Sequence, residues 1–202
     1  IGWCDWSSDV CSSDLNSADG YGGAIVAWYA DCTIANNVIA RNSALAGGGI
    51  MNWRSVPTIR NNTIVANRPN AMQLETTLIP GWPAVTVPIQ NNIIWQNEIR
   101  VAEDVVDGEY DVRYNDIQGG WDDTGNLHAD PLFADAENGD YHLKSQAGRW
   151  EPGTAAWIVD NVTSPCIDAG NPSAGYSKEP QPNGNRVNLG AYGGTDQASK
   201  SP

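Results

Sequence analysis

The chain has 202 residues, a formal net charge of -13 and an apolar fraction of 41% that includes 9 tryptophans. This length fits one domain with an appendage, and the apolar content suffices for a folded core. The acidity argues against nucleic acid and anionic membranes as partners, and no apolar run is long enough to insert into a bilayer. We therefore expect a globular monomer.

The first fifteen residues do not resemble the rest of the chain. Asp5 to Leu15 spell DWSSDVCSSDL, which resembles the translation of a constant arm of a sequencing-library adapter, and Cys4 fits the codon before it. We predict that residues 1–15 are not native, make no essential packing and have replaced the natural N-terminus with its signal peptide. A native Ser/Asp loop is the alternative.

Two cysteines remain outside this segment, Cys32 and Cys166. They are far apart in the sequence, so we expect no bridge between them. We interpret both as small buried apolar residues.

From Gly20 onward the chain repeats itself, with copies at 20–42, 45–68 and 78–97 and a weaker one at 112–120. The aligned apolar residues are separated by 25, 30 and 23 residues and are Ile34, Ile59, Ile89 and Val112. Such periods indicate a solenoid, and short β-branched runs between Gly, Asn and Pro are typical of strands and turns. Leucines are too few for a leucine-rich repeat. We predict three short parallel strands per turn, with the aligned residues stacked inside.

Asparagine pairs stand between apolar runs in three copies, at Asn36 and Asn37, Asn61 and Asn62, and Asn91 and Asn92. A two-residue corner between strands needs one left-handed residue, and asparagine tolerates that conformation best after glycine. Stacked asparagine side chains can also bond to one another along a coil. We predict that these pairs form structural corners.

Several segments resemble right-handed parallel β-helix proteins of the pectin-lyase-like superfamily, in their exported bacterial type. They are the turn 47–67, GNLHADPLF (125–133), GDYHL (139–143), SPCIDAG (164–170) and LGAYGG (189–194). The resemblance implies an all-β right-handed parallel β-helix and an extracellular or cell-surface location. We expect terminal β-helix turns over 16–120, an insertion at 70–88, and a loop-rich segment over 121–202 that caps the open end of the coil.

Candidate catalytic residues are scarce. β-helix lyases use an Arg or Lys base with calcium, and β-helix hydrolases use clustered Asp, yet Glu75 and Glu98 are the only carboxylates between Thr33 and Ile99. The catalytic residues are therefore unknown, and we assign no metal ligand. The two histidines lack metal-ligand spacing, and calcium is left open as a cofactor at the acidic stretches 103–111 and 135–140.

Three tryptophans share one offset, since each stands three residues after an aligned isoleucine: Trp28 after Ile25, Trp53 after Ile50 and Trp82 after Ile79. An odd offset in a strand reverses the face, so an inward isoleucine places the tryptophan outward. We predict an outer stack of rings on successive turns. It serves either as a carbohydrate-binding surface or as mutual support between the rings.

We expect the C-terminal fragment of an exported bacterial β-helix protein that contacts polysaccharide without catalysis of its own. Two alternatives stay open. One is a truncated polysaccharide lyase or hydrolase whose active site lies in missing upstream turns. The other is a purely structural or adhesive surface protein.

Overall fold

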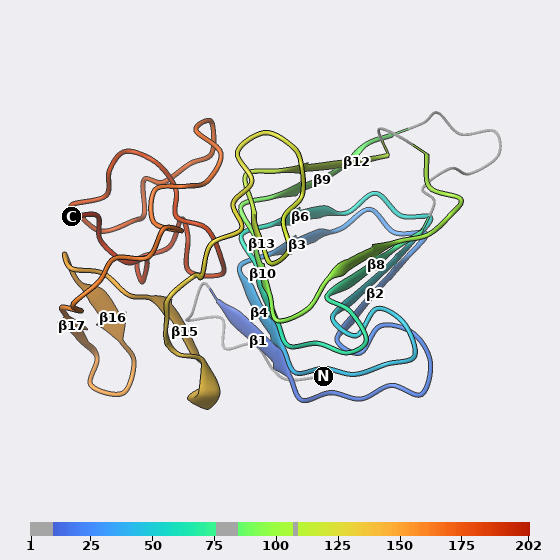
Figure 1. Ribbon diagram of the computed structural model, residues 1–202, viewed down its shortest axis with the longest axis horizontal. Coiled ribbons are helices and arrows are strands. Elements are labelled where there is room, and N and C mark those ends of the chain that lie inside the picture. Colours follow the sequence, from blue (N-terminus) through green and yellow to red (C-terminus); the bar gives the residue numbers. More distant parts are fainter. Residues whose placement is uncertain (1–9, 76–84, 107–108) are drawn as a thin grey trace.

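A computed structural model describes residues 10–75, 85–106 and 109–202. These residues form a coil of parallel strands with a loop-rich segment beside it (Figure 1). Among them, no helix is both long and apolar enough to cross a membrane.

Three parallel sheets make the walls of the coil. Sheet A joins β1 (Cys11–Asp14), β4 (Asn37–Ala40), β7 (Thr63–Val65), β10 (Ile93–Trp95) and β13 (Asp116–Ile117). Sheet B joins β2 (Ile25–Trp28), β5 (Ile50–Trp53), β8 (Met72–Leu74) and β11 (Ile99–Val101). Sheet C joins β3 (Thr33–Ala35), β6 (Thr58–Arg60), β9 (Val87–Gln90) and β12 (Tyr110–Arg113). From β2 on, the chain passes through sheets B, C and A four times in the described ranges, which confirms the predicted all-β parallel β-helix.

The interior of the coil is a stack of branched apolar side chains. The register pairs Ile34 with Ile59, Ile59 with Ile89 and Ile89 with Val112, and all four are buried. Burying one such side chain contributes about 1.5–3 kcal/mol. The predicted alignment of these four residues is confirmed.

The asparagine pairs lie at the corner between sheets C and A. The first residue of each pair is left-handed, with φ of 55° at Asn36, 50° at Asn61 and 60° at Asn91. The second residues form a ladder, the corner ladder, in which each backbone and side-chain N–H donates to the next Oδ1 at 2.9–3.3 Å. Its members are Asn37, Asn62, Asn92, Asn115 and Asn126.

A second ladder, which the sequence analysis did not identify, follows the strands of sheet A. Its members are Asn16, Asn42, Asn67 and Asn97, bonded in the same way at 2.9–3.3 Å. The residue before each one is left-handed although none is glycine. The ladder hydrogen bonds satisfy backbone N–H groups at bends that would otherwise leave them unpaired.

The third turn differs from the sequence alignment in sheet B. Met72, not Ile79, pairs with Ile50, because β8 lies inside the stretch 70–88 that was expected to be an insertion. β9 also begins within it, at Val87. A methionine fills the interior position as well as an isoleucine does, so the repeat continues there without its usual residue.

β1 falls within the segment predicted to be non-native. It pairs in parallel with β4, from Cys11 opposite Asn37 to Asp14 opposite Ala40. That residues 1–15 make no essential packing stays a prediction. Without β1, the edge of β4 would have unpaired backbone N–H and C=O groups. Main-chain hydrogen bonds can form with a segment of almost any sequence. The pairing leaves the origin of this stretch an open prediction.

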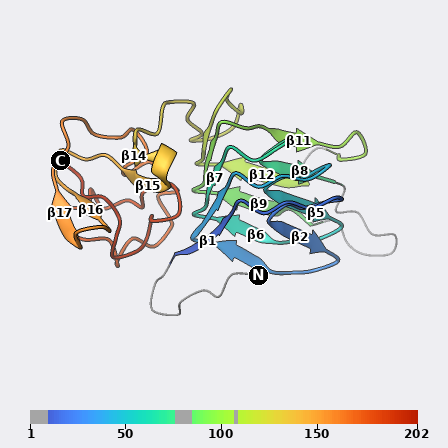
Figure 2. The same ribbon diagram turned by 90° about the horizontal axis from the view of Figure 1, so that it is seen from below.

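The segment after the coil contains β14 (Phe133–Asp135), the 3-10 turn η1 (Ala136–Asn138), β15 (Asp140–Leu143), β16 (Arg149–Glu151) and β17 (Ala156–Ile158). Only its beginning lies over the end of the coil, where Trp121 packs on the core and Asn126 ends the corner ladder. Most of the rest lies beside sheet A (Figure 2). Its main role is therefore to cover a side of the coil and not the end alone.

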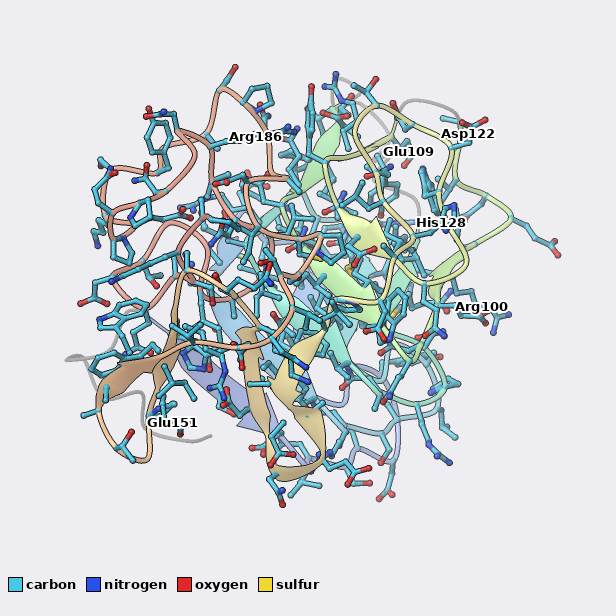
Figure 3. All side chains as sticks on the ribbon, turned by 60° about the vertical axis from the view of Figure 1, so that its left-hand side comes forward. Arg100, Glu109, Asp122, His128, Glu151 and Arg186 are labelled. Carbon is cyan, nitrogen blue, oxygen red and sulfur yellow. The ribbon has the colours of Figure 1, made fainter. Side chains whose placement is uncertain are left out.

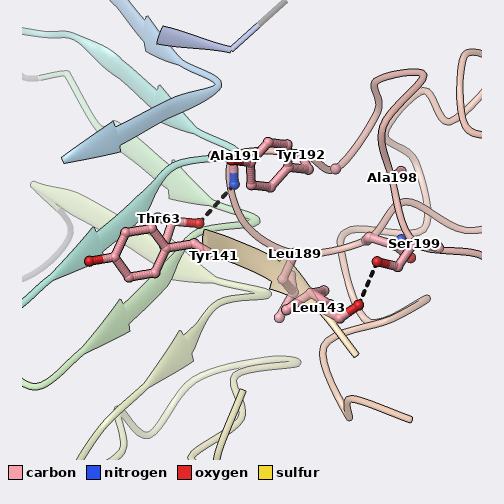
Figure 4. Close-up of a pocket in the computed structure, with 10 residues that line it drawn as sticks. Thr63, Tyr141, Leu143, Leu189, Ala191, Tyr192, Ala198 and Ser199 are labelled. Atoms are coloured by element: carbon pink, nitrogen blue, oxygen red, sulfur yellow. Dashed lines mark hydrogen bonds between the residues drawn. The ribbon is translucent and has the colours of Figure 1, made fainter. Parts of the chain in front are cut away.

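The contact between this segment and sheet A is apolar with a few hydrogen bonds. Ala191 packs with Val38 and Val65, and Leu189 packs with Ile93. The Ala191 N–H donates to the Thr63 hydroxyl at 3.0 Å (Figure 4). The outward side chains of β4 and β7 and the Ile93 side chain of β10 are thus removed from water, whereas those of β1 stay exposed.

The cysteines differ in their surroundings. Cys32 and Cys166 are both free thiols, so the prediction that they are not bridged is confirmed. Cys166 is buried and donates to Asp116 at 3.0 Å, as expected of an interior residue. Cys32 is exposed, contrary to expectation, because it lies in the turn between β2 and β3, outside the stacked interior.

Candidate binding face

The register of sheet B places two of the three predicted tryptophans side by side. Trp28 pairs with Trp53 across β2 and β5, and their rings stack with centroids 5.3 Å apart and planes 9° apart. Both point outward, because the isoleucines three residues earlier face the core. The third, Trp82, lies outside the described residues.

Further side chains complete a surface that we call the aromatic face, made of Tyr21, Trp28, Tyr29, Trp53 and Arg54. Tyr21 sets its ring edge against Trp53 at 6.4 Å between centroids and an interplanar angle of 67°. Trp28 is 59% exposed, Tyr21 57% and Tyr29 55%. A contiguous group of exposed aromatic rings is uncommon on a monomer unless it binds something.

The stacking decides which ring surface is accessible. Trp28 and Trp53 cover each other's facing sides, since near-parallel rings at 5.3 Å leave no room for a third layer. The open surface is the side of Trp28 that faces away from Trp53, together with the ring edges. The pair is therefore a single platform and not a series of separate ones.

Glu75 follows Trp53 in the next turn. Its backbone N–H donates to the Asn52 carbonyl at 3.0 Å, which continues the sheet B register. Its carboxylate accepts from the Gln73 amide at 2.9 Å, and its carbonyl accepts from the Tyr110 hydroxyl at 2.6 Å. Burial raises the pKa of Tyr110, so this phenol stays protonated and keeps donating. A polar group thus borders the tryptophan platform.

Arg54 adds positive charge at the rings, and Arg100 adds it two strands beyond β5 in sheet B. Arg54 donates from Nη1 to the Tyr29 hydroxyl at 2.9 Å, and it takes part in none of the ion pairs found across the described residues. Arg100 on β11 pairs in register with Gln73 and extends into solvent (Figure 3). Aromatic surface bordered by hydrogen-bonding groups is the chemistry that accommodates a sugar, which has apolar C–H faces and a rim of hydroxyl groups.

The acidic stretches serve local structure. Asp135 accepts from the Asn138 backbone and side chain at 3.4 and 2.7 Å, which caps η1. Asp140 accepts at 2.6 Å from His142, and this bond helps to keep the pKa of Asp140 low against the opposing effect of burial. Across the described ranges, no three His, Cys, Asp or Glu side chains gather as a metal site.

Together, the coil and its surface define a class: parallel β-helix proteins with an exposed aromatic face on one sheet. The chain belongs to the disaggregatase-related family, whose sequence pattern matches residues 11–170. The match covers the four turns and much of the segment beside them. Comparison with curated proteins and with solved structures found no match.

Proposed function

We propose that this chain belongs to an exported β-helix protein and that it contacts polysaccharide through the aromatic face. A sugar packs against the outward edges of the Trp28–Trp53 ring pair, and the polysaccharide runs along sheet B past Arg54 and Glu75. The observation that carries the proposal is the outward aromatic cluster on sheet B, in which Trp28 stacks on Trp53 and Tyr21 sets its edge against Trp53. A contiguous exposed apolar patch, unlike a single exposed ring, points to a binding partner.

Three further points support this function. The family description names a disaggregatase, and contact with polysaccharide suits a relative of a protein that separates aggregated material. The resemblance of the repeats to pectin-lyase-like proteins favours a polysaccharide partner and a location outside the cell or on its surface. The formal charge of -13 disfavours nucleic acid.

Trp28→Ala should weaken retention on an insoluble polysaccharide without unfolding the coil. The loss of one stacking platform corresponds to about 1–3 kcal/mol, or roughly 5- to 150-fold in affinity, by analogy with bases on aromatic rings. Sedimentation with a panel of insoluble polysaccharides measures the bound fraction, and thermal unfolding measures stability. Trp28→Phe should keep most of the binding.

Trp150→Ala is the matched control, because it removes a tryptophan from the hairpin β16–β17, away from sheet B. If Trp28→Ala lowers stability but leaves binding unchanged, the ring pair is structural and the proposal is wrong. Release of soluble sugar during the assay would instead indicate the enzymatic alternative.

A further inference from the structure

Two carboxylates in the segment beside the coil, one on a buried residue and one on a half-buried residue, each have a buried oxygen without a partner. Glu179 is 4% exposed, and its Oε1 accepts from the backbone N–H groups of Asn188 at 2.9 Å and Gly194 at 2.7 Å. Its Oε2 is buried and has no hydrogen-bond partner. A buried carboxylate oxygen without a hydrogen-bond or ion partner is destabilising, so its presence in a folded protein points to a bound ligand.

Asp168 belongs to the same network. Its Oδ1 is also buried without a partner, and its backbone N–H donates to the Asn188 side chain at 2.8 Å. The chain closes tightly around this carboxylate, since a Cβ on Gly184 would lie 2.1 Å from Oδ2. Gly184 has a φ of +40°, so a side chain there would be both strained and obstructed.

No positive side chain neutralises the pair. None of the ion pairs among the described residues includes Glu179 or Asp168. Arg186, the labelled arginine of this segment in Figure 3, donates to the carbonyls of Ala169 and Gly170. The buried, unpartnered Oε2 of Glu179 therefore needs a proton or a cation as its partner.

We propose that Asp168 and Glu179 hold one divalent cation of the calcium class. Calcium binds carboxylate, amide and main-chain oxygens together, so two acidic side chains suffice when loop oxygens or water complete the shell. The ion would fix the loop whose next residues, from Asn188 to Ala191, pack on sheet A.

The test uses the intact chain after chelation. Addition of CaCl2 should bind one ion per chain in calorimetry and raise the unfolding temperature by about 5–10 °C at saturation. Glu179→Gln should abolish both effects. It should not lower stability without calcium, because a glutamine keeps the acceptor for Asn188 and Gly194 and carries no buried charge. Asp168→Asn provides a second variant if the first fails to fold.

Glu137→Gln is the matched control, because it makes the same chemical change at an exposed position and should leave the calcium response intact. Three results would overturn the proposal. They are an absent calcium response in the wild type, an equal response in Glu179→Gln, or the same temperature shift from NaCl at equal ionic strength. In the first case an ordered water or a proton is the partner of Oε2.

Discussion

Replacing Asn92 by alanine should lower the free energy of unfolding by about 3–5 kcal/mol. Asn92 is fully buried in the corner ladder. Its amide donates to the carbonyls of Ile59 and Gln90, at 3.2 and 3.0 Å, and to the Asn115 side chain at 2.9 Å. Alanine removes all of these bonds and leaves the carbonyls buried without that donor.

The change also affects the preceding turn. The Asn92 Oδ1 accepts from the backbone and side chain of Asn62, at 2.9 and 3.0 Å. The variant leaves the buried Asn62 backbone N–H unmet, while the Asn62 side-chain amide keeps its bonds to the carbonyls of Ile34 and Arg60. Each unmet group costs about 1–3 kcal/mol, which exceeds the value of an average hydrogen bond. Urea unfolding measures the loss as a lower midpoint concentration, with the dependence of the unfolding free energy on urea concentration unchanged.

Asn138→Ala is the control for this prediction, since Asn138 is exposed and bonds to Asp135 at the surface. It should change the unfolding free energy by less than about 1 kcal/mol. Equal losses in the two variants would show that the corner ladder adds nothing beyond an ordinary surface bond.

Leu189→Asp should release the segment beside the coil from sheet A. Leu189 is 1% exposed and packs with Ile93, Leu143 and Cys166. No positive side chain belongs to this apolar cluster, so an aspartate there would be a buried, unpaired charge. When the segment detaches, the carboxylate of the introduced aspartate becomes hydrated, but the apolar outer side of sheet A becomes exposed to water.

The thiol of Cys166 reports this detachment. It is fully buried in the native protein, whereas Cys32 is exposed, so the experiment uses a Cys32→Ser background. A loss of about 3 kcal/mol should raise the labelling rate of Cys166 on the order of 100-fold, since each 1.4 kcal/mol is tenfold. Val159→Asp adds the same charge at a site that is 71% exposed and should leave the rate unchanged. Unchanged labelling in Leu189→Asp would mean that the contact with sheet A does not hold the segment.

The repeat could be predicted where each turn keeps the same residue at the same position. The isoleucine stack of sheet C and the Trp28–Trp53 pair follow directly from equal spacing. The third turn could not be predicted in sheet B, because Met72 and Glu75 stand where isoleucine and tryptophan recur. The next Ile–Trp pair with the same offset, Ile79 and Trp82, comes later in the sequence and fits the repeat pattern in their place.

Two other features had a sequence pattern that was not used. The second ladder recurs five residues after the second asparagine of each pair, as at Asn62 and Asn67. Sheet A has continuous apolar runs such as 64–66 and 93–95, and strands buried on both faces have that pattern. Those runs indicate that another part of the chain covers the outer side, although they do not identify which part.

The contacts of Asp168 and Glu179 could not be anticipated from spacing. The side chain of Asn188 accepts from the Asp168 backbone, and the backbone of Asn188 donates to the Glu179 carboxylate. Gly184, which has no side chain to clash with Asp168, lies between Glu179 and Asn188 in the sequence. Such a network depends on how loops fold back, and loops carry no period. The position of the aromatic face, by contrast, is a direct product of the repeat.

Radical footprinting of Trp28 tests the account most directly. The protein is oxidised with and without the polysaccharide that it retains best, and peptide mass spectrometry measures oxidation at each tryptophan. We expect the bound polysaccharide to lower oxidation of Trp28 severalfold while Trp150, on the hairpin β16–β17, oxidises as before. If Trp28 oxidises at the same rate while the polysaccharide is bound, the aromatic face is not the binding surface.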